Sequence, residues 1–330
     1  MNSQPSSVTA PSLDGMIAEA QVRERLRADP CNGDALFCLS AILSDRGDDL
    51  EAASLLEQAI YCQPAFTRSY LQLARLYYQM GRTRETVATY RAWRQQEPEN
   101  PEAQHMAAAV AGKYIPERCT EAYIEQHFDQ FSKTFDDVLM NRLDYRGPEL
   151  VATELARFGG EAAAGLEVLD AGCGTGLCGE RIRPWCRSLV GVDLSPQMLE
   201  LAEGRGVYDA LIRSDLCNYL RQQYSALDAI VSADVLIYFG ALDEFIFLAR
   251  QALRAEGLLI VTVEGLFDAR TEPYKLQISG RYTHRESYLR EELGRADLKL
   301  VDLRKVTIRY ELGRSVEGFA LTAQKARRDV

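Results

Sequence analysis

The sequence predicts two domains, an all-α array of helical repeats followed by an α/β domain with a mainly parallel, doubly wound sheet. Before about residue 113, prolines and glycines recur at a fixed interval of 34 residues. Beyond about residue 165, short apolar segments alternate with amphipathic ones, as strands alternate with helices. At 330 residues, with 47% hydrophobic and 26% charged residues, the chain is long enough for both domains.

The interval is seen first in Pro30, Pro64 and Pro98, which lie 34 residues apart. Gly47 and Gly81 keep the same spacing, which is the period of the tetratricopeptide repeat, a helix–turn–helix unit. Each glycine is expected at a turn, where a positive φ is easiest. Apolar residues at helical spacing predict the first helix of each unit: Leu36, Leu39 and Leu43, then Tyr70, Leu73 and Tyr77.

We expect this tetratricopeptide-like domain over residues 16–113, after a disordered terminus at residues 1–15. Half-helices at about Met16–Arg27 and Pro101–Lys113 are expected to cap the two repeats. Two functions fit such an array. The array is either a rigid scaffold, which includes a contact within a homodimer, or a concave groove that binds a peptide or a carrier protein.

The second domain is expected over residues 114–330 and begins with a connector, residues 114–160. Helical spacing of aromatic residues predicts an amphipathic first part, and Pro148 is expected to start a helix that ends near Phe158. The aromatic rings either form a lid over a ligand or pack against the sheet; they are Tyr123, Phe128, Phe131, Phe135 and Tyr145.

Five apolar segments are expected to form parallel strands: 166–170, 189–193, 210–213, 229–233 and 258–263. Helices are expected between them, notably at 196–203 and 241–253. The tail differs, because Val306–Glu311 and Gly318–Ala323 flank a turn at Gly313. This pattern predicts an antiparallel hairpin at the edge of the sheet.

The most specific motif follows the first strand and opens a helix, which is where a doubly wound sheet binds ligands. Its glycines let the backbone approach a ligand closely. Leu177 stands where a dinucleotide fingerprint has its third glycine, which disfavours a pyrophosphate. The carboxylate of Asp170 favours a cationic ligand such as a sulfonium amino acid. The motif comprises Asp170, Gly172, Cys173, Gly174 and Gly176.

Three further acids follow the next strands. Asp193 can accept two hydrogen bonds from ribose hydroxyls. Asp215, between Ser214 and Leu216, can accept one from an adenine amino group, and Ala233–Asp234 would line the floor near a reacting methyl. Structural roles remain open: Asp170 and Asp193 as a helix cap and a turn acid, Asp215 as a surface acid, and Asp234 as a helix cap.

The run from Val168 to Ala202, with its Asp170–Gly176 and Gly191–Ser195 motifs, resembles class I S-adenosylmethionine-dependent methyltransferases of the UbiG/BioC type. The whole chain is similar to bacterial predicted methyltransferases with tetratricopeptide repeats, including at Phe128–Asp136, Leu143–Arg146 and Gly280–His284. The resemblance implies a Rossmann-like seven-stranded sheet of order 3-2-1-4-5-7-6. It also implies S-adenosylmethionine as cofactor and S-adenosylhomocysteine as product.

Residue by residue, the resemblance places Asp170 and Gly172 near the methionine part of the cofactor, Asp193 at the ribose, and Asp215 with Leu216 at the adenine. The neighbouring positions complete the expected cofactor site. It comprises Asp170, Gly172, Cys173, Gly174, Gly176, Asp193, Leu194, Met198, Ser214, Asp215, Leu216, Ala233 and Asp234.

The expected catalytic residues are His284 and Tyr238. Thr283 and Glu286 have the spacing of a capping box, so His284 is predicted to be the first residue of a helix. An imidazole there could point into a cleft as general base, although a packing histidine is the alternative. The acceptor pocket is expected between the connector and about Phe267–Tyr288, with Phe131, Phe135, Tyr145, Arg281 and Tyr282.

Other classes of protein are disfavoured. A formal charge of −10 argues against tracking a nucleic-acid backbone, and no apolar run is long enough to span a membrane. The lack of a CxxC pair and the presence of only three histidines argue against a metal site. A disulfide framework is typical of small secreted domains, so the eight cysteines of this longer chain are expected to be reduced, in a cytoplasmic protein.

Three functions remain open. The first is methyl transfer to a small-molecule or carrier-bound acceptor. The second is methylation of a protein recruited by the repeats, and the third is a degenerate fold that acts as an interaction protein.

Overall fold

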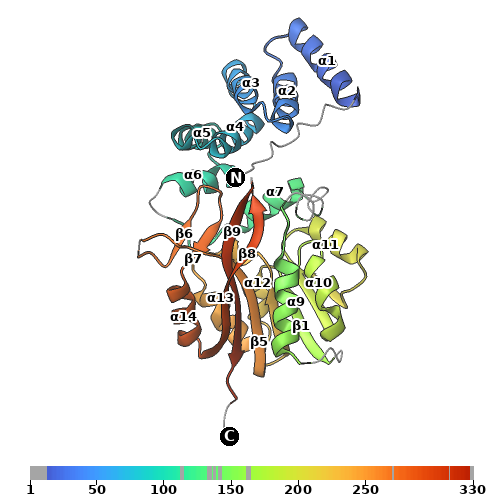
Figure 1. Ribbon diagram of the computed structural model, residues 1–330, viewed down its shortest axis with the longest axis vertical. Helices are drawn as coiled ribbons and strands as arrows, with labels where there is room; N and C mark the ends of the chain where they lie inside the picture. The colour runs from blue at the N-terminus through green and yellow to red at the C-terminus, as the bar shows by residue number, and fades with distance from the viewer. Residues whose placement is uncertain are drawn as a thin grey trace, which may run out of the picture. The chain divides into compact units, whose positions relative to one another are not determined.

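The structure, a computed structural model, describes residues 13–111, 115–131, 136, 139, 143–160, 165–269, 271–311 and 313–327 (Figure 1). The chain divides into two compact units, Met1–Val110 and Ala111–Val330. Each unit is described by itself. The predicted disordered terminus lies mostly outside the described residues.

The first unit confirms the helical repeats. Gly47 and Gly81 take φ values of 85° and 73° at the turns inside the two repeats, as a left-handed turn requires. The apolar residues predicted for the first helix of each pair are all buried. The helices are α1 (Leu13–Ala28), α2 (Gly33–Asp45), α3 (Asp49–Cys62), α4 (Arg68–Gln79), α5 (Thr83–Gln96) and α6 (Pro101–Ala111).

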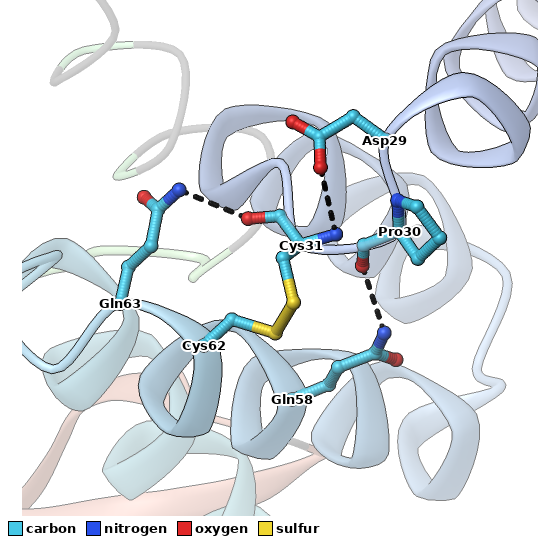
Figure 2. The surroundings of a disulfide bond; sticks show 6 residues. All are labelled: Asp29, Pro30, Cys31, Gln58, Cys62 and Gln63. Atoms are coloured by element: carbon cyan, nitrogen blue, oxygen red, sulfur yellow. Dashed lines mark hydrogen bonds between the residues drawn. A yellow bond between two sulfur atoms is a disulfide. The ribbon is translucent and has the colours of Figure 1, made fainter.

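A disulfide bond joins Cys31, which precedes α2, to Cys62 at the end of α3 (Figure 2). The antiparallel helices bring the two Cα atoms to 5.4 Å. Gln58 donates to the Pro30 carbonyl and Gln63 to the Cys31 carbonyl, both at 2.9 Å, so the same junction is also held by hydrogen bonds. The prediction that all the thiols are reduced is therefore wrong for this pair, because 31 residues separate its members and no local motif marks them.

The second unit contains the predicted seven-stranded sheet. Its order is β3-β2-β1-β4-β5-β9-β8, in which β5, β9 and β8 pair antiparallel and the rest parallel. The predicted order is confirmed; a separate two-stranded sheet shifts the last two numbers. The strands are β1 (Leu166–Ala171), β2 (Cys186–Asp193), β3 (Ala210–Arg213), β4 (Leu227–Ser232), β5 (Leu253–Glu264), β6 (Tyr274–Leu276), β7 (Tyr282–His284), β8 (Leu298–Glu311) and β9 (Arg314–Lys325).

Helices cover both faces of this sheet (Figure 1). In β1, Val168 packs in the core beneath α9 and α10, and the next residue, Leu169, packs in the core beneath α12, α13 and α14. This alternation follows from the two-residue period of a strand. The helices are α7 (Glu121–Phe131), α9 (Gly147–Phe158), α10 (Leu177–Ile182), α11 (Pro196–Gly204), α12 (Leu216–Leu220), α13 (Asp243–Ala252) and α14 (Glu286–Arg295).

The capping box predicted at Thr283 is wrong. Residues 282–284 form β7, which pairs antiparallel with β6, and α14 begins only at Glu286 after an extended Arg285. The sequence Tyr282–Thr283–His284 buries all three side chains, so its strand pairing and packing outweigh the local capping signal.

We predict that the disulfide stabilises the repeat unit. Closing a loop of 31 residues should contribute about 3.7 kcal/mol to the free energy of unfolding. Replacing both cysteines, Cys31→Ser with Cys62→Ser, should lower stability by that order in chemical denaturation of the full chain. A reducing agent should lower the stability of the wild type but not of the double variant. A wild type that does not respond to reductant would contradict the prediction.

Candidate functional site

A cavity of about 360 Å³ opens at the carboxyl ends of β1, β2, β3 and β4, within the second unit. Most of the residues predicted for the cofactor and acceptor sites line it. The predicted residues in its wall are Gly172, Cys173, Gly174, Asp193, Leu194, Met198, Ser214, Asp215, Leu216, Ala233, Asp234, Tyr238, Tyr145 and Arg281. Their roles toward a ligand remain predictions.

The loop after β1 needs its glycines. Gly172, Gly174 and Gly176 have φ values of 79°, 52° and 90°, which strain any other residue. A Cβ on Gly172 would lie 2.4 Å from the side chain of Val235. Gly172 and Cys173 donate their N–H groups to the Val192 carbonyl at 2.8 and 3.0 Å, which fixes the loop against the end of β2. The backbone thus forms part of the cavity wall.

Asp193 joins this loop to the next one. Its Oδ2 accepts from the Gly174 N–H and its Oδ1 from the Ser195 N–H, both at 2.9 Å. Burial raises the pKa of Asp193, and the backbone hydrogen bonds oppose that rise. The backbone N–H groups of Gly174, Ser195 and Leu194 do not use all the acceptor positions of a carboxylate, so Asp193 can still accept a hydrogen bond from a group in the cavity.

Asp215 is not a surface acid, since only 6% of the residue is exposed. Its Oδ1 accepts from the Asn218 N–H at 3.0 Å and so caps α12. Its Oδ2 accepts from Arg118 of the connector at 3.1 Å. The side chain therefore caps a helix and lines the cavity at once, and the connector is held against it.

Asp170 and Gly176 do not lie in the cavity wall, contrary to the prediction. Asp170 is 1% exposed and its Oδ2 accepts from the Tyr208 hydroxyl at 2.7 Å. Its Oδ1 has no hydrogen-bond partner among the described residues. Burial raises the pKa of Asp170 to about 7. Asp170 lies behind the glycine loop, so any effect on a ligand acts across that loop.

Asp234 is not a helix cap. It has a left-handed backbone, with φ 60°, and the 3-10 helix η4 (Leu236–Tyr238) begins after Val235 instead. The Asp234 N–H donates to Thr262 Oγ1 at 2.8 Å. Its Oδ2 pairs with Arg309, and its Oδ1 has no partner in the described part of the chain.

Arg309, on β8, is at the centre of a charge cluster that the sequence did not predict. We define this cluster as Asp234, Glu264, Arg281, Arg309 and Glu311. Arg309 pairs with all three carboxylates, while Arg281 pairs with Glu264 at 2.8 Å and with Glu311 at 2.6 Å. Burial acts to raise the pKa of Glu311, but the two arginines outweigh it and hold that pKa below its usual value.

His284 does not reach the cavity. It is fully buried on β7, and its Nε2 lies 3.1 Å from the Gly240 carbonyl. Burial lowers the pKa of His284 to about 4, so the ring is neutral at physiological pH. Tyr282 is also fully buried, and its hydroxyl donates to the Pro116 carbonyl at 2.7 Å. These placements correct both predictions: the two side chains support β7 and the connector.

Tyr238 and Tyr145 do line the cavity. Phe128 of α7 packs edge-on against Tyr238, with ring centroids 5.5 Å apart, so this connector ring forms part of the wall. Burial raises the pKa of Tyr238 and of Tyr145, so both hydroxyls stay protonated and can donate hydrogen bonds. The side chains of Phe131 and Phe135 lie outside the described residues.

Within the described residues, no cluster of three or more His, Cys, Asp and Glu side chains could hold a metal ion. No described helix is long and apolar enough to cross a membrane.

We predict that Asp170 makes stability fall as pH rises. Its unfolded pKa is near 4 and its folded pKa about 7, so between these values the folded protein holds a proton that the unfolded chain has lost. Asp170→Asn should remove this loss and, relative to wild type, gain about 2.6 kcal/mol between pH 5 and pH 8. Urea denaturation across this range measures the difference. Asp297→Asn, at an exposed position, is the control, and an equal change there would refute the prediction.

A model of the methyltransferase domain matches residues 169–261, and one of the tetratricopeptide repeat matches residues 67–110. The mitochondrial ubiquinone biosynthesis O-methyltransferase of Mus musculus is 25% identical over 43% of this chain and 41% of that protein. The chain thus spans about two fifths of the length of that relative. Among solved structures, the cyclase SpnF has a TM-score of 0.51 at 20% identity, with 64% of this chain and 98% of that chain covered. The cyclase shows the shared fold alone.

The ubiquinone biosynthesis O-methyltransferase of Mesorhizobium japonicum is 30% identical over 175 residues, which cover 46% of this chain and 69% of that protein. The match of the methyltransferase domain and the order of the sheet point to the same family as this relative. The chain belongs to the S-adenosylmethionine-dependent methyltransferase family, with tetratricopeptide repeats ahead of its methyltransferase domain.

Proposed function

We propose that this protein transfers a methyl group from S-adenosylmethionine to a small-molecule or carrier-bound acceptor and releases S-adenosylhomocysteine. The observation that carries the proposal is Asp193, fixed at the end of β2 by the glycine loop and lining the cavity. This is where an acid can accept hydrogen bonds from both ribose hydroxyls.

The residues present fit the cofactor. Asp193 would hold the ribose, Asp215 and Leu216 would contact the adenine, and the glycine loop leaves room for the methionine part. The cofactor supplies a methyl group already activated on a sulfonium. Acidic groups near the cavity attract that positive charge, whereas they would repel the negative charge of a pyrophosphate.

The chain's own part in the reaction is to bind the reacting groups, align them and exclude water from them. Apolar side chains from the connector and from the end of β4 line much of the cavity and exclude water, among them Phe128, Val235 and Ile237. Tyr238 and Tyr145 offer hydroxyl donors that can orient an acceptor. Relatives named for ubiquinone biosynthesis and for magnesium-protoporphyrin support an acceptor that is a small molecule.

We predict that the purified protein binds S-adenosylmethionine and S-adenosylhomocysteine and that Asp193→Ala weakens both at least about 100-fold. Two hydrogen bonds to a charged acceptor at about 1.5 kcal/mol each account for that factor. Titration calorimetry gives the affinities. Glu203→Ala, an exposed change on α11, is the matched control and should bind as the wild type does. Undiminished binding by Asp193→Ala would contradict the assignment.

The tetratricopeptide match favours a second candidate, methylation of a protein that the repeats recruit. A labelled methyl group distinguishes the two. When the protein and radiolabelled S-adenosylmethionine are added to fractionated cell extract, we expect label in the small-molecule fraction. Label in a discrete protein band would support the second candidate. Cofactor binding without transfer to either fraction would support an interaction protein, since the fold alone is shared by a cyclase.

A further inference from the structure

Arg118 is held at a fixed point of the cavity wall by its backbone. It belongs to the connector, where it forms an antiparallel bridge with Phe239. The Cys119 N–H donates to the Tyr238 carbonyl at 2.8 Å, and the Glu117 carbonyl accepts from two N–H groups of the facing loop at 2.7 and 2.8 Å. These bonds involve no side chain, so we expect them to remain when the side chain of Arg118 is changed.

The side chain of Arg118 has hydrogen-bond donors that the chain leaves unused. Its Nη1 donates to Asp215 Oδ2 at 3.1 Å, and its guanidinium carbon lies 6.0 Å from the centre of the Phe239 ring. Among the described residues, nothing accepts from its Nε or its Nη2, and neither atom is buried. The side chain is 37% exposed and the residue lines the cavity. A ligand in the cavity can therefore reach these N–H groups.

Asp215 is the buried partner in this ion pair. Its side chain is only 5% exposed, its Oδ1 caps α12 through the Asn218 N–H, and its Oδ2 holds Arg118. A carboxylate in such a place needs a cation beside it, because a buried charge left unpaired costs several kcal/mol. Arg118 is thus the more accessible partner, and Asp215 orients its guanidinium.

The geometry points to Arg118 as a specificity-determining residue that donates a hydrogen bond to the adenine ring of the cofactor. This inference rests on the proposed function, which puts the adenine at Asp215 and Leu216. The ion pair sets N–H donors beside a carboxylate, so it complements a base that has an acceptor nitrogen beside an amino group. Adenine has this pattern on both sides of its amino group, through N1 and through N7.

The first measurement compares analogues of the base. In the 1-deaza and 7-deaza analogues of S-adenosylhomocysteine, a C–H group that cannot accept a hydrogen bond replaces one ring nitrogen. We expect the wild type to bind one of the two at least about tenfold more weakly than the parent by calorimetry, because a hydrogen bond to a charged donor is lost. The 3-deaza analogue should bind as the parent does, since N3 is not beside the amino group.

The second measurement removes the guanidinium. Arg118→Met keeps an apolar side chain, and its affinity for S-adenosylhomocysteine should fall to its affinity for the sensitive deaza analogue, so that the preference disappears. Arg213→Met is the matched control. Arg213 also joins the connector to the end of β3, through Glu125 at 2.6 Å, but it does not line the cavity. This control should keep the preference of the wild type.

A third ligand separates the base from the methionine part of the cofactor. 5′-Methylthioadenosine keeps the adenine and the ribose but lacks the amino acid. Arg118→Met should weaken its binding by the same factor as the binding of S-adenosylhomocysteine. If only S-adenosylhomocysteine is weakened, Arg118 binds the carboxylate of the amino acid instead, and the inference is wrong.

Two other results overturn the inference. A wild type that binds all three deaza analogues as tightly as the parent makes no hydrogen bond to N1 or N7. An Arg118→Met variant that weakens the parent and the deaza analogues by one factor shows that Arg118 only supports the wall. If the wild type binds neither S-adenosylhomocysteine nor 5′-methylthioadenosine, the proposed function itself fails, and that result differs from a loss of preference.

Discussion

The site depends on the carboxylate of Asp193, because it bonds the loop after β1 to the loop after β2. One oxygen fixes Gly174 in the loop after β1, and the other fixes Ser195 at the start of α11. The glycines that make this possible cannot be replaced without strain, since each has a positive φ. Asp193, placed at the end of a strand, therefore ties together two loops that meet at the cavity wall.

The sequence was sufficient for features that depend on short-range pattern. The 34-residue interval and the acids at the strand ends follow from periodicity and motif, while the strand order was implied by the family resemblance, and the structure has all of them. What failed depended on distant segments. Arg309 comes from β8 and meets Asp234, 75 residues earlier, only in the folded sheet. His284 looked like a helix start because a local capping signal cannot show the burial that makes Tyr282–His284 a strand.

The same reasoning explains Asp170 and the disulfide. Asp170 has the right spacing from the glycines, yet its side chain turns toward Tyr208 behind them, and only packing decides that direction. Cys31 and Cys62 meet because α2 and α3 run antiparallel. The geometry of the repeat implies that these two ends lie close together, whereas the spacing of the cysteines in the sequence does not. The hairpin of β9 and the edge strand β8 also does more than close the sheet, since β8 carries Arg309 and Glu311 to the wall of the cavity.

The start of the connector, residues 117–119, is bonded to segments that lie at the cavity wall. Cys119 N–H donates to the Tyr238 carbonyl, Gly240 and Ala241 donate to the Glu117 carbonyl, and Arg118 pairs with Asp215. The connector is therefore a bonded part of the wall and not a free flap. Since Arg118 reaches Asp215 from the connector, loss of this one ion pair would loosen two parts of the wall that lie 97 residues apart in the sequence.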